Sequence, residues 1–295
     1  MFVDMHGNAR IKLCMHLHST RSTGTLTPSE LEEAYAAEGY DAIAITDSWV
    51  YGDEREAEGL LVLSGIQCDV GVEGGDGYRI VGVGMTSDPQ IPEDWKNMKR
   101  TAAAKTAQIA DKIRLYNGFS FVVPSAEATD GARRLLSAGT FDGIEIFTPD
   151  LAAKHGYGFF EGVVNELAKF GSFPSLVASD DAENGEMELF GGAVMVLADE
   201  MTGASIVRAL KAGRFYATEG PEVHLSVSAG GRVSVDCSPC SKIELFTGSA
   251  DTEGKLFEGE GLIGAQYSVK ESDRYVRAQV TDATGARAWT NYVIL

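Results

Sequence analysis

The chain has 295 residues, which is enough for one large domain with a well-buried core and a smaller second domain. Its formal net charge of -18 comes from 43 acidic and 25 basic side chains, and this balance repels nucleic acid and anionic membrane surfaces. No apolar run reaches transmembrane length, and the first residues lack the basic-then-apolar pattern of a signal peptide. We therefore expect a soluble, cytoplasmic protein that binds neither nucleic acid nor membranes.

The stretch IKLCMHLHSTRSTG, residues 11–24, is predicted to be a strand that ends near His16 and His18. Side chains two residues apart on a strand point to the same face, so the two imidazoles lie side by side. They could take two adjacent positions around one metal ion. Two histidines at the mouth of a barrel, with no ion, fit the same pattern.

The next segments predict a strand–helix–strand unit. Thr27-Pro28-Ser29-Glu30 forms a capping box with proline at the first helical position, and a helix should run from there to Gly39. The apolar stretch 41–47 then predicts a short strand that ends on Asp47. Such a unit implies a parallel sheet.

Strands and helices continue to alternate over about the first 215 residues. The strands are predicted at 60–69, 78–85, 119–124, 142–147, 174–181 and 193–198, and the helices at 93–116, 131–137, 159–170 and 203–212. Seven or eight buried strands in this order favour a (βα)-type barrel, complete or distorted, with an open doubly wound sheet as the alternative.

From about Pro221 the residues alternate with period two between glycine-rich turns, which predicts a small antiparallel β module. The predicted domains are therefore residues 1–220 and 221–295. Four cysteines do not make a disulfide framework in a chain of this size. Cys237-Ser-Pro-Cys240 has the C-x-x-C spacing, but the second pair of a zinc knuckle is absent, so we predict a turn between strands rather than a metal or redox site.

In (βα) barrels the chemistry gathers at the carboxyl ends of the strands. Polar residues at or just beyond these predicted ends are His16, His18, Asp47, Gln67, Asp69, Arg79, Glu145, Asp180, Asp181 and Glu183. Any one of the acids fits a solvated loop start equally well. The two histidines together with Asp181 are the combination that predicts a site.

Several motifs resemble the PHP (polymerase and histidinol phosphatase) family. They are MHLHST before the capping box, EGYDAIAITD and ASDDAE, while GIEIF, GRFYATEGP and YVRAQVTDATGARAWTN are similar to the subgroup with a C-terminal β extension. The resemblance covers nearly the whole chain. It implies a distorted (βα)7 barrel that holds up to three metal ions, often zinc, manganese or iron, and that commonly cleaves phosphate esters.

The family's metal ligands carry over only in part. His16, His18 and Asp181 match ligand positions, and Asp47 matches the acid of the second motif. The residues that stand where the family has other ligands are Ser48, Gln67, Arg79, Val123 and Glu183. The remaining histidines, His6, His155 and His224, align with none of these positions, so the chain lacks the ligands of a full three-metal centre.

The first functional hypothesis is a phosphoesterase-like hydrolase with one divalent zinc, manganese or iron ion. His16, His18 and Asp181 would bind the ion, and Gln67 could offer a neutral oxygen. The proton acceptor would be Asp47 or Glu183.

The sequence is compatible with two roles for Arg79. This arginine could bind the anionic group of a small phosphorylated or anionic substrate, or it could pair with Asp69 or Asp181 in an empty pocket. The second functional hypothesis is a catalytically silent relative that acts as a ligand-binding or regulatory module. A nucleic-acid module is disfavoured by the charge.

Overall fold

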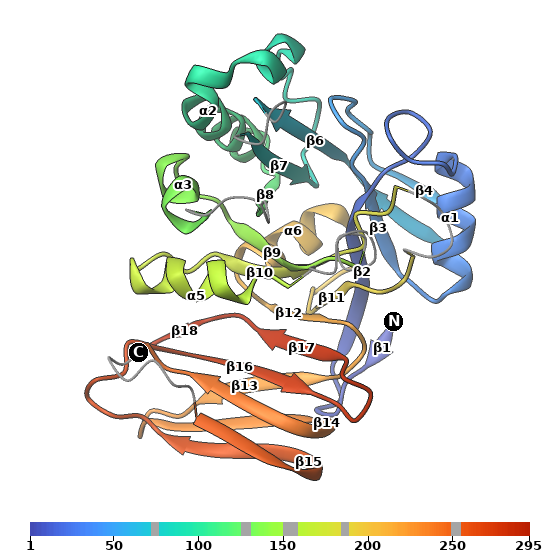
Figure 1. The fold of residues 1–295 in the computed structure, drawn as a ribbon. Coiled ribbons are helices and arrows are strands. Elements are labelled where there is room, and N and C mark those ends of the chain that lie inside the picture. Colours follow the sequence, from blue (N-terminus) through green and yellow to red (C-terminus); the bar gives the residue numbers. More distant parts are fainter. Residues whose placement is uncertain (72–76, 125–130, 150–158, 184–188, 249–254) are drawn as a thin grey trace. The chain divides into compact units, whose positions relative to one another are not determined.

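The computed structural model describes residues 1–71, 77–124, 131–149, 159–183, 189–248 and 255–295 (Figure 1). The chain forms two compact units, Met1–Arg214 and Phe215–Leu295. The sequence predicts the boundary at Pro221, and the second unit begins a few residues earlier, at Phe215. Within the described ranges, no helix is long and apolar enough to cross a membrane.

The first sheet of the first unit is built around β2 (Ala9–Leu17). β2 pairs in parallel with β3 (Ala42–Ile45), and β3 pairs in parallel with β5 (Leu60–Leu63). β1 (Phe2–Val3), β4 (Arg55–Ala57) and β11 (Ala193–Val196) pair antiparallel with β2, β5 and β2, respectively.

α1 (Pro28–Ala37) connects β2 to β3, and both hydrogen bonds of the Thr27–Glu30 capping box are present. Leu31 and Tyr35 of this helix belong to one buried apolar cluster with residues of β3 and β5. The strand–helix–strand unit predicted from the sequence is therefore confirmed, and burial of one helix face stabilises it.

The second sheet has the order β10–β9–β8–β7–β6. Its strands are β6 (Gly65–Val70), β7 (Tyr78–Val83), β8 (Phe119–Val123), β9 (Gly143–Phe147) and β10 (Ser175–Ala178). β8, β9 and β10 are parallel, whereas β7 is antiparallel to both of its neighbours. Single bridges, Leu17 to Ala182 and Ser48 to Gln67, join chain segments near the ends of β2, β3, β6 and β10.

The mixed α/β class is as predicted, but the residues that the structure describes form no closed (βα)7 barrel. The cause lies around Ser64, where the chain passes from β5 in one sheet to β6 in the other with no helix between them. A Cβ atom at Gly65 would lie 2.5 Å from the Ile45 carbonyl oxygen, so this close passage requires glycine. The single strand predicted at 60–69 is consequently two strands.

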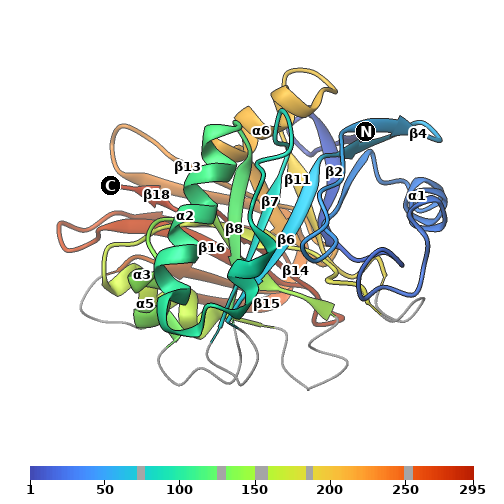
Figure 2. The same cartoon turned by 90° about the horizontal axis from the view of Figure 1, so that it is seen from above.

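The helices that the structure describes in the first unit after α1 are α2 (Ala102–Leu115), α3 (Gly131–Ser137), α5 (Glu161–Lys169) and α6 (Gly203–Lys211). α2 packs on β7 and β8 (Figure 2). The helix predicted at 93–116 is shorter, because residues Glu93–Asn97 and Lys99–Thr101 form 3-10 turns. These turns bury no residue, whereas the buried face of α2 begins at Ala102.

The second unit is a sheet of antiparallel strands, as the alternation beyond Pro221 predicts. Its strands are β12 (Phe215–Thr218), β13 (Val223–Val227), β14 (Arg232–Phe246), β15 (Lys255–Ser268), β16 (Tyr275–Thr281), β17 (Arg287–Thr290) and β18 (Val293–Ile294). Its core includes Trp289, which is fully buried and donates to Gln279 Oε1 at 3.0 Å.

The cysteine pair lies inside β14, at an irregularity in its pairing with β15, and not in a turn between strands as predicted. The sulfur atoms of Cys237 and Cys240 are 3.6 Å apart, and both residues are buried. Burial raises the pKa of the Cys237 thiol to about 12, so this thiol stays protonated at neutral pH.

Candidate metal centre

His16 and His18 lie at the carboxyl end of β2, and both side chains are buried. Their ring centroids are 5.3 Å apart, because the strand points the two side chains to the same face. The His18 amide donates to the Ala182 carbonyl oxygen at 3.3 Å, which ties the end of β2 to the segment after β10. The two imidazoles therefore meet the residues of that segment.

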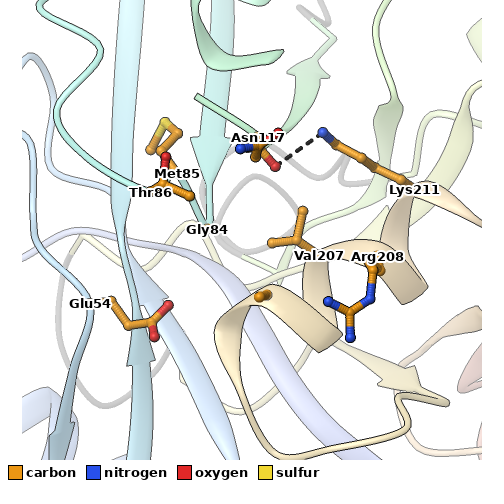
Figure 3. A pocket seen from close by; sticks show the side chains of 9 residues that line it. Glu54, Gly84, Met85, Thr86, Asn117, Val207, Arg208 and Lys211 are labelled. Atoms are coloured by element: carbon orange, nitrogen blue, oxygen red, sulfur yellow. Dashed lines mark hydrogen bonds between the residues drawn. The ribbon is translucent and has the colours of Figure 1, made fainter. Parts of the chain in front are cut away.

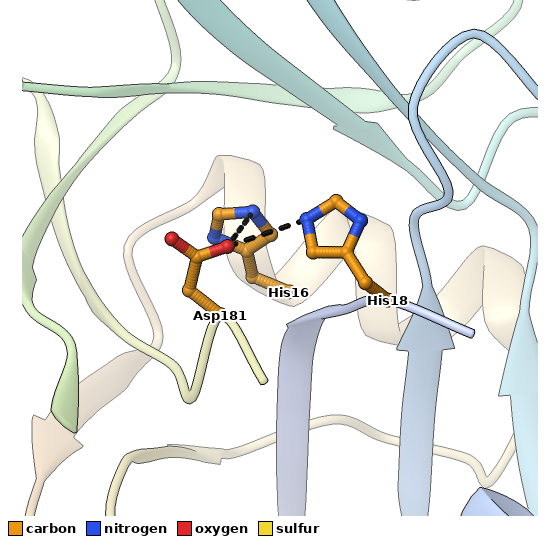
Figure 4. Close-up of side chains that lie close together, drawn as sticks. All are labelled: His16, His18 and Asp181. Atoms are coloured by element: carbon orange, nitrogen blue, oxygen red, sulfur yellow. Dashed lines mark ion pairs between the residues drawn. The ribbon is translucent and has the colours of Figure 1, made fainter. Parts of the chain in front are cut away.

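Asp181 is the residue of that segment that contacts both histidines (Figure 4). Its Oδ1 lies 3.0 Å from His16 Nε2 and 3.3 Å from His18 Nε2. The backbone of Asp181 has φ 49°, in the left-handed region, and its amide donates to the His16 carbonyl oxygen at 2.9 Å. One potential ligand atom from each of the three residues lies within 4.8 Å of the others.

His16 also contacts Gln67 of β6 and Glu145 of β9. His16 Nε2 lies 2.5 Å from Gln67 Oε1, and His16 Nδ1 lies 3.1 Å from Glu145 Oε1. The Gln67 amide nitrogen donates to Ser48 Oγ at 3.1 Å and to Asp69 Oδ2 at 3.0 Å, which turns its oxygen toward His16. Gln67 is thus placed beside the cluster of His16, His18 and Asp181.

The sequence places Glu145 at a strand end but does not predict its contact with His16. The Glu145 side chain is fully buried and contacts His16 Nδ1. The sequence signal is an acid inside the apolar strand GIEIF, because a buried carboxylate requires a partner.

Arg79 of β7 lies between the cluster and solvent. Its Nε donates to Asp69 Oδ1 at 3.0 Å, and its Nη1 donates to Asp181 Oδ2 at 3.2 Å. The Arg79 side chain is 28% exposed, whereas that of Asp181 is 1% exposed. Arg79 therefore forms ion pairs with Asp69 and Asp181, which is the second of its two predicted roles. Its side chain is also partly exposed to solvent.

The charges of the cluster shift the pKa of its members in opposite directions. Burial lowers the pKa of His16, but the carboxylates of Asp181 and Glu145 outweigh burial and raise it to about 9. Burial raises the pKa of Asp181, but His16 and Arg79 lower it well below its usual range. At neutral pH without metal, the cluster therefore holds an aspartate and a protonated His16.

Asp47 lies on the other side of His18 from Asp181. Its carboxylate accepts from the Ser19 amide at 2.7 Å, from Ser19 Oγ at 2.6 Å and from Ser22 Oγ at 2.6 Å. Ser22 Oγ is in turn 3.2 Å from His18 Nδ1. Asp47 is therefore linked to His18 by hydrogen bonds through Ser22.

The other positions that the sequence analysis singled out are more dispersed. Glu183 is half-buried, and its Oε1 accepts from Thr23 Oγ1 at 3.1 Å. Val123 lies opposite Arg79 in the pairing of β7 with β8. His155 is outside the described residues.

Asp180 precedes Asp181 but belongs to a separate buried network. Its carboxylate accepts from the Tyr35 hydroxyl, from the Phe190 amide at 2.8 Å and from the Gly192 amide at 2.7 Å. Burial raises the pKa of Asp180 to about 6. Asp180 thus holds α1 and residues 190–192 together beside the cluster.

A groove of about 610 Å³ elsewhere in the first unit contains none of the predicted site residues (Figure 3). Its polar lining residues are Glu54, Thr86, Asn117, Arg208 and Lys211. Lys211 Nζ donates to the Asn117 carbonyl oxygen at 3.0 Å, so one of its two cations is already engaged.

No protein-family model matches the chain. A 5'-3' exoribonuclease of Haemophilus influenzae is 28% identical over 131 residues, which are 42% of this chain and 45% of that protein. The chain therefore spans less than half the length of this curated relative.

Two solved structures match the chain. One is a two-domain protein from Bacteroides vulgatus containing a predicted PHP-like metal-dependent phosphoesterase, with a TM-score of 0.54, 14% identity, and 99% of this chain and 98% of that chain covered. The other is an amidohydrolase from Chromobacterium violaceum with bound sulfate and no metal, with a TM-score of 0.41, 17% identity, and 60% and 89% covered.

The chain is thus a mixed α/β protein with a C-terminal β module and a buried histidine–aspartate cluster at the strand ends. Its fold is that of the PHP-like two-domain proteins, which confirms the resemblance at the level of the fold.

Proposed function

We propose that the chain is a metal-dependent hydrolase that holds one divalent ion at His16, His18 and Asp181. One observation supports this above all: His18 Nε2 is buried 3.3 Å from Asp181 Oδ1 and has no hydrogen-bond partner among the described residues. A buried polar atom without a partner costs about 1–3 kcal/mol. A cation bound by both atoms would remove that cost.

The donor types fit such an ion. Two imidazoles and one carboxylate are typical ligands of zinc, iron or manganese, with positions left for water and substrate. Gln67 Oε1, 2.5 Å from His16 Nε2, adds a neutral oxygen at the same place. Arg79 already supplies a positive charge on the other oxygen of Asp181, which favours one ion rather than two or three.

We propose a phosphate ester as the bond that is cleaved. When bound, a divalent ion lowers the pKa of a water molecule and polarises a phosphoryl oxygen. The planar guanidinium of Arg79 suits two oxygens of a phosphate group and is partly exposed, so an incoming phosphate can replace Asp69 or Asp181 as its partner.

For the proton acceptor we propose Glu183 rather than Asp47. Asp47 already accepts three hydrogen bonds from Ser19 and Ser22, which occupies its carboxylate in holding the loop after β2. Glu183 is half-buried two residues beyond Asp181, and its Oε1 accepts from Thr23 Oγ1, whose residue is exposed, at 3.1 Å.

The substrate we propose is a small phosphorylated molecule. The names of the exoribonuclease and the PHP-like phosphoesterase both imply phosphate ester cleavage, and the first also implies RNA. A net charge of -18 opposes binding of a long polyanion, because each phosphate contact must overcome the repulsive field of the protein.

The test is metal analysis and hydrolysis with the full chain. We expect at most one zinc, manganese or iron ion per chain, and metal-dependent cleavage of a small aryl phosphate in preference to an RNA oligonucleotide. His18→Ala and Asp181→Ala should each lower turnover by at least about 100-fold, the scale for losing electrostatic stabilisation of a transition state. Asp111→Ala, at an exposed carboxylate of α2, is the control and should leave metal content and turnover unchanged.

A catalytically silent relative is the second candidate, and one observation favours it. The Arg79–Asp181 ion pair neutralises the buried carboxylate without any metal ion. If wild-type protein binds no metal, or if His18→Ala leaves hydrolysis intact, the metalloenzyme proposal is wrong and the silent relative replaces it.

A further inference from the structure

We infer that Glu145 and Ser22 are positioning residues: Ser22 holds His18 with its ring proton on Nδ1, and Glu145 holds the Nδ1–H of His16, so that Nε2 of each imidazole faces Asp181. The inference rests on the proposed function in one respect: the Nε2 atoms are taken to be the ones that bind the ion. The tautomers themselves follow from hydrogen bonding on the far side of each ring.

For His18 the tautomer follows from the single proton of a serine hydroxyl. Ser22 Oγ lies 2.6 Å from Asp47 Oδ1 and 3.2 Å from His18 Nδ1. Asp47 can only accept there, because its two oxygens also receive the amide and hydroxyl of Ser19. The Ser22 proton therefore points to Asp47, and Ser22 Oγ accepts from His18 Nδ1–H.

This assignment explains the orphaned Nε2 atom of His18 at the centre of the cluster. With the proton on Nδ1, His18 Nε2 carries a lone pair, and it faces Asp181 Oδ1, which also carries lone pairs, at 3.3 Å. Two acceptors cannot form a hydrogen bond with each other. The missing hydrogen-bond partner of His18 Nε2 is what this tautomer requires.

For His16 the corresponding partner is Glu145. Its Oε1 lies 3.1 Å from His16 Nδ1 in a fully buried environment. The other ring nitrogen faces two acceptors, Gln67 Oε1 at 2.5 Å and Asp181 Oδ1 at 3.0 Å, and the amide nitrogen of Gln67 is turned away to Ser48 and Asp69. Glu145 therefore orients Nε2 of His16 into the cluster.

The two histidines are held by different means, one directly by a carboxylate and the other by a carboxylate acting through a serine. Such partners fix the tautomer and orientation of a ligand histidine, and losing one typically weakens metal binding by about 10- to 100-fold. We expect losses in this range for Ser22→Ala and Glu145→Gln.

The affinity test is competition of Zn²⁺ between a chelator of known affinity and the full chain. Two controls alter hydrogen-bonded side chains that touch neither histidine. Ser120→Ala removes a buried hydroxyl that donates to Asp142 at 3.0 Å, and Glu32→Gln alters a buried carboxylate that pairs with Arg55. The controls should stay within about threefold of wild type, the range below the losses expected for positioning residues.

The second test reads the tautomer without any metal. Long-range ¹H–¹⁵N NMR of the ring nitrogens, assigned with His18→Ala, should show His18 protonated at Nδ1 only, and Ser22→Ala should introduce the other tautomer. A proton on Nε2 of wild-type His18 would overturn the inference, as would a wild type that binds zinc with the same affinity as both variants.

The two tests separate this inference from the proposed function. A wild type that binds no zinc but shows the Nδ1–H tautomer of His18 refutes the metal site and supports the positioning roles. A wild type that binds zinc, with affinity unchanged in Ser22→Ala and Glu145→Gln, supports the metal site and refutes the positioning roles.

Discussion

The protonation of His16 predicts how metal binding depends on pH. Its pKa of about 9 means that Nε2, the nitrogen facing Asp181, holds a proton at neutral pH in the metal-free protein. A divalent ion at this nitrogen must displace that proton. Metal affinity should therefore rise with pH up to about 9 and become constant above it.

The size of the effect follows from the shift. Between pH 7 and pH 9 the dissociation constant should fall by about 50-fold, or about 2.3 kcal/mol, because His16 is still half protonated at pH 9 and one factor of ten corresponds to 1.36 kcal/mol. Approximately one proton should be released per ion bound at pH 7.

The stability of the metal-free protein should change in the opposite sense. The folded-state pKa of His16 lies above its ordinary value of 6.5, so the ion pairs with Asp181 and Glu145 contribute fully below pH 6.5 and are lost as pH rises through 9. The shift from 6.5 to about 9 is worth about 3 kcal/mol in the free energy of unfolding, at 1.36 kcal/mol per unit.

Both quantities can be measured on the full chain. Titration calorimetry of zinc in buffers with different ionisation enthalpies gives the proton count, and urea unfolding at pH 6.5 and pH 9 gives the stability change. His16→Gln, which has no proton to displace, should flatten both dependences. Zinc affinity that is constant from pH 7 to pH 9 with no proton release would refute the reasoning.

Three further predictions concern neighbours of the cluster. Gln67→Glu should bind zinc at least about 10-fold more tightly in the chelator competition, because a carboxylate replaces a neutral oxygen beside His16, and unchanged affinity would contradict a ligand role. Arg79→Gln should raise KM for an aryl phosphate by about 10-fold or more, since a charge-assisted contact is lost, and steady-state kinetics with unchanged KM would exclude Arg79 from substrate binding. Tyr35→Phe should lower the free energy of unfolding by about 1–3 kcal/mol in urea, because the buried Asp180 carboxylate loses a donor, and a neutral result would mean that the backbone amides suffice.

The sequence predicted the cluster because its three members are placed by local rules. The i, i+2 spacing on β2 puts His16 and His18 on one face, and the end of β10 places Asp181 at the same edge. The capping box of α1 was equally local. These features depend on a few neighbouring residues, so periodicity is enough to find them.

The sheet topology depends on contacts between distant residues. A buried strand has the same apolar pattern whether its neighbour is parallel or antiparallel, so the antiparallel β6–β7 pair could not be distinguished from a βαβ unit. Nothing near Gly65 in the sequence reveals that the Ile45 carbonyl lies against it.

The positioning residues show the same limit in the site. Glu145 was detectable as a carboxylate in an apolar strand, but its partner His16 is 129 residues away. Ser22 has no sequence signal, because a serine in a loop is common, and its role depends on Asp47 and His18 meeting around it.

The guanidinium of Arg79 is a positive charge beside the cluster that, unlike a metal ion, cannot dissociate. Chelation or metal starvation would remove a bound ion, but the guanidinium is encoded in the sequence and continues to balance Asp69 and Asp181. The metal-free chain is thereby spared an unpaired buried carboxylate, which would otherwise be strongly destabilising. Loss of the ion should therefore silence the chain without unfolding it, and activity should return when metal becomes available again.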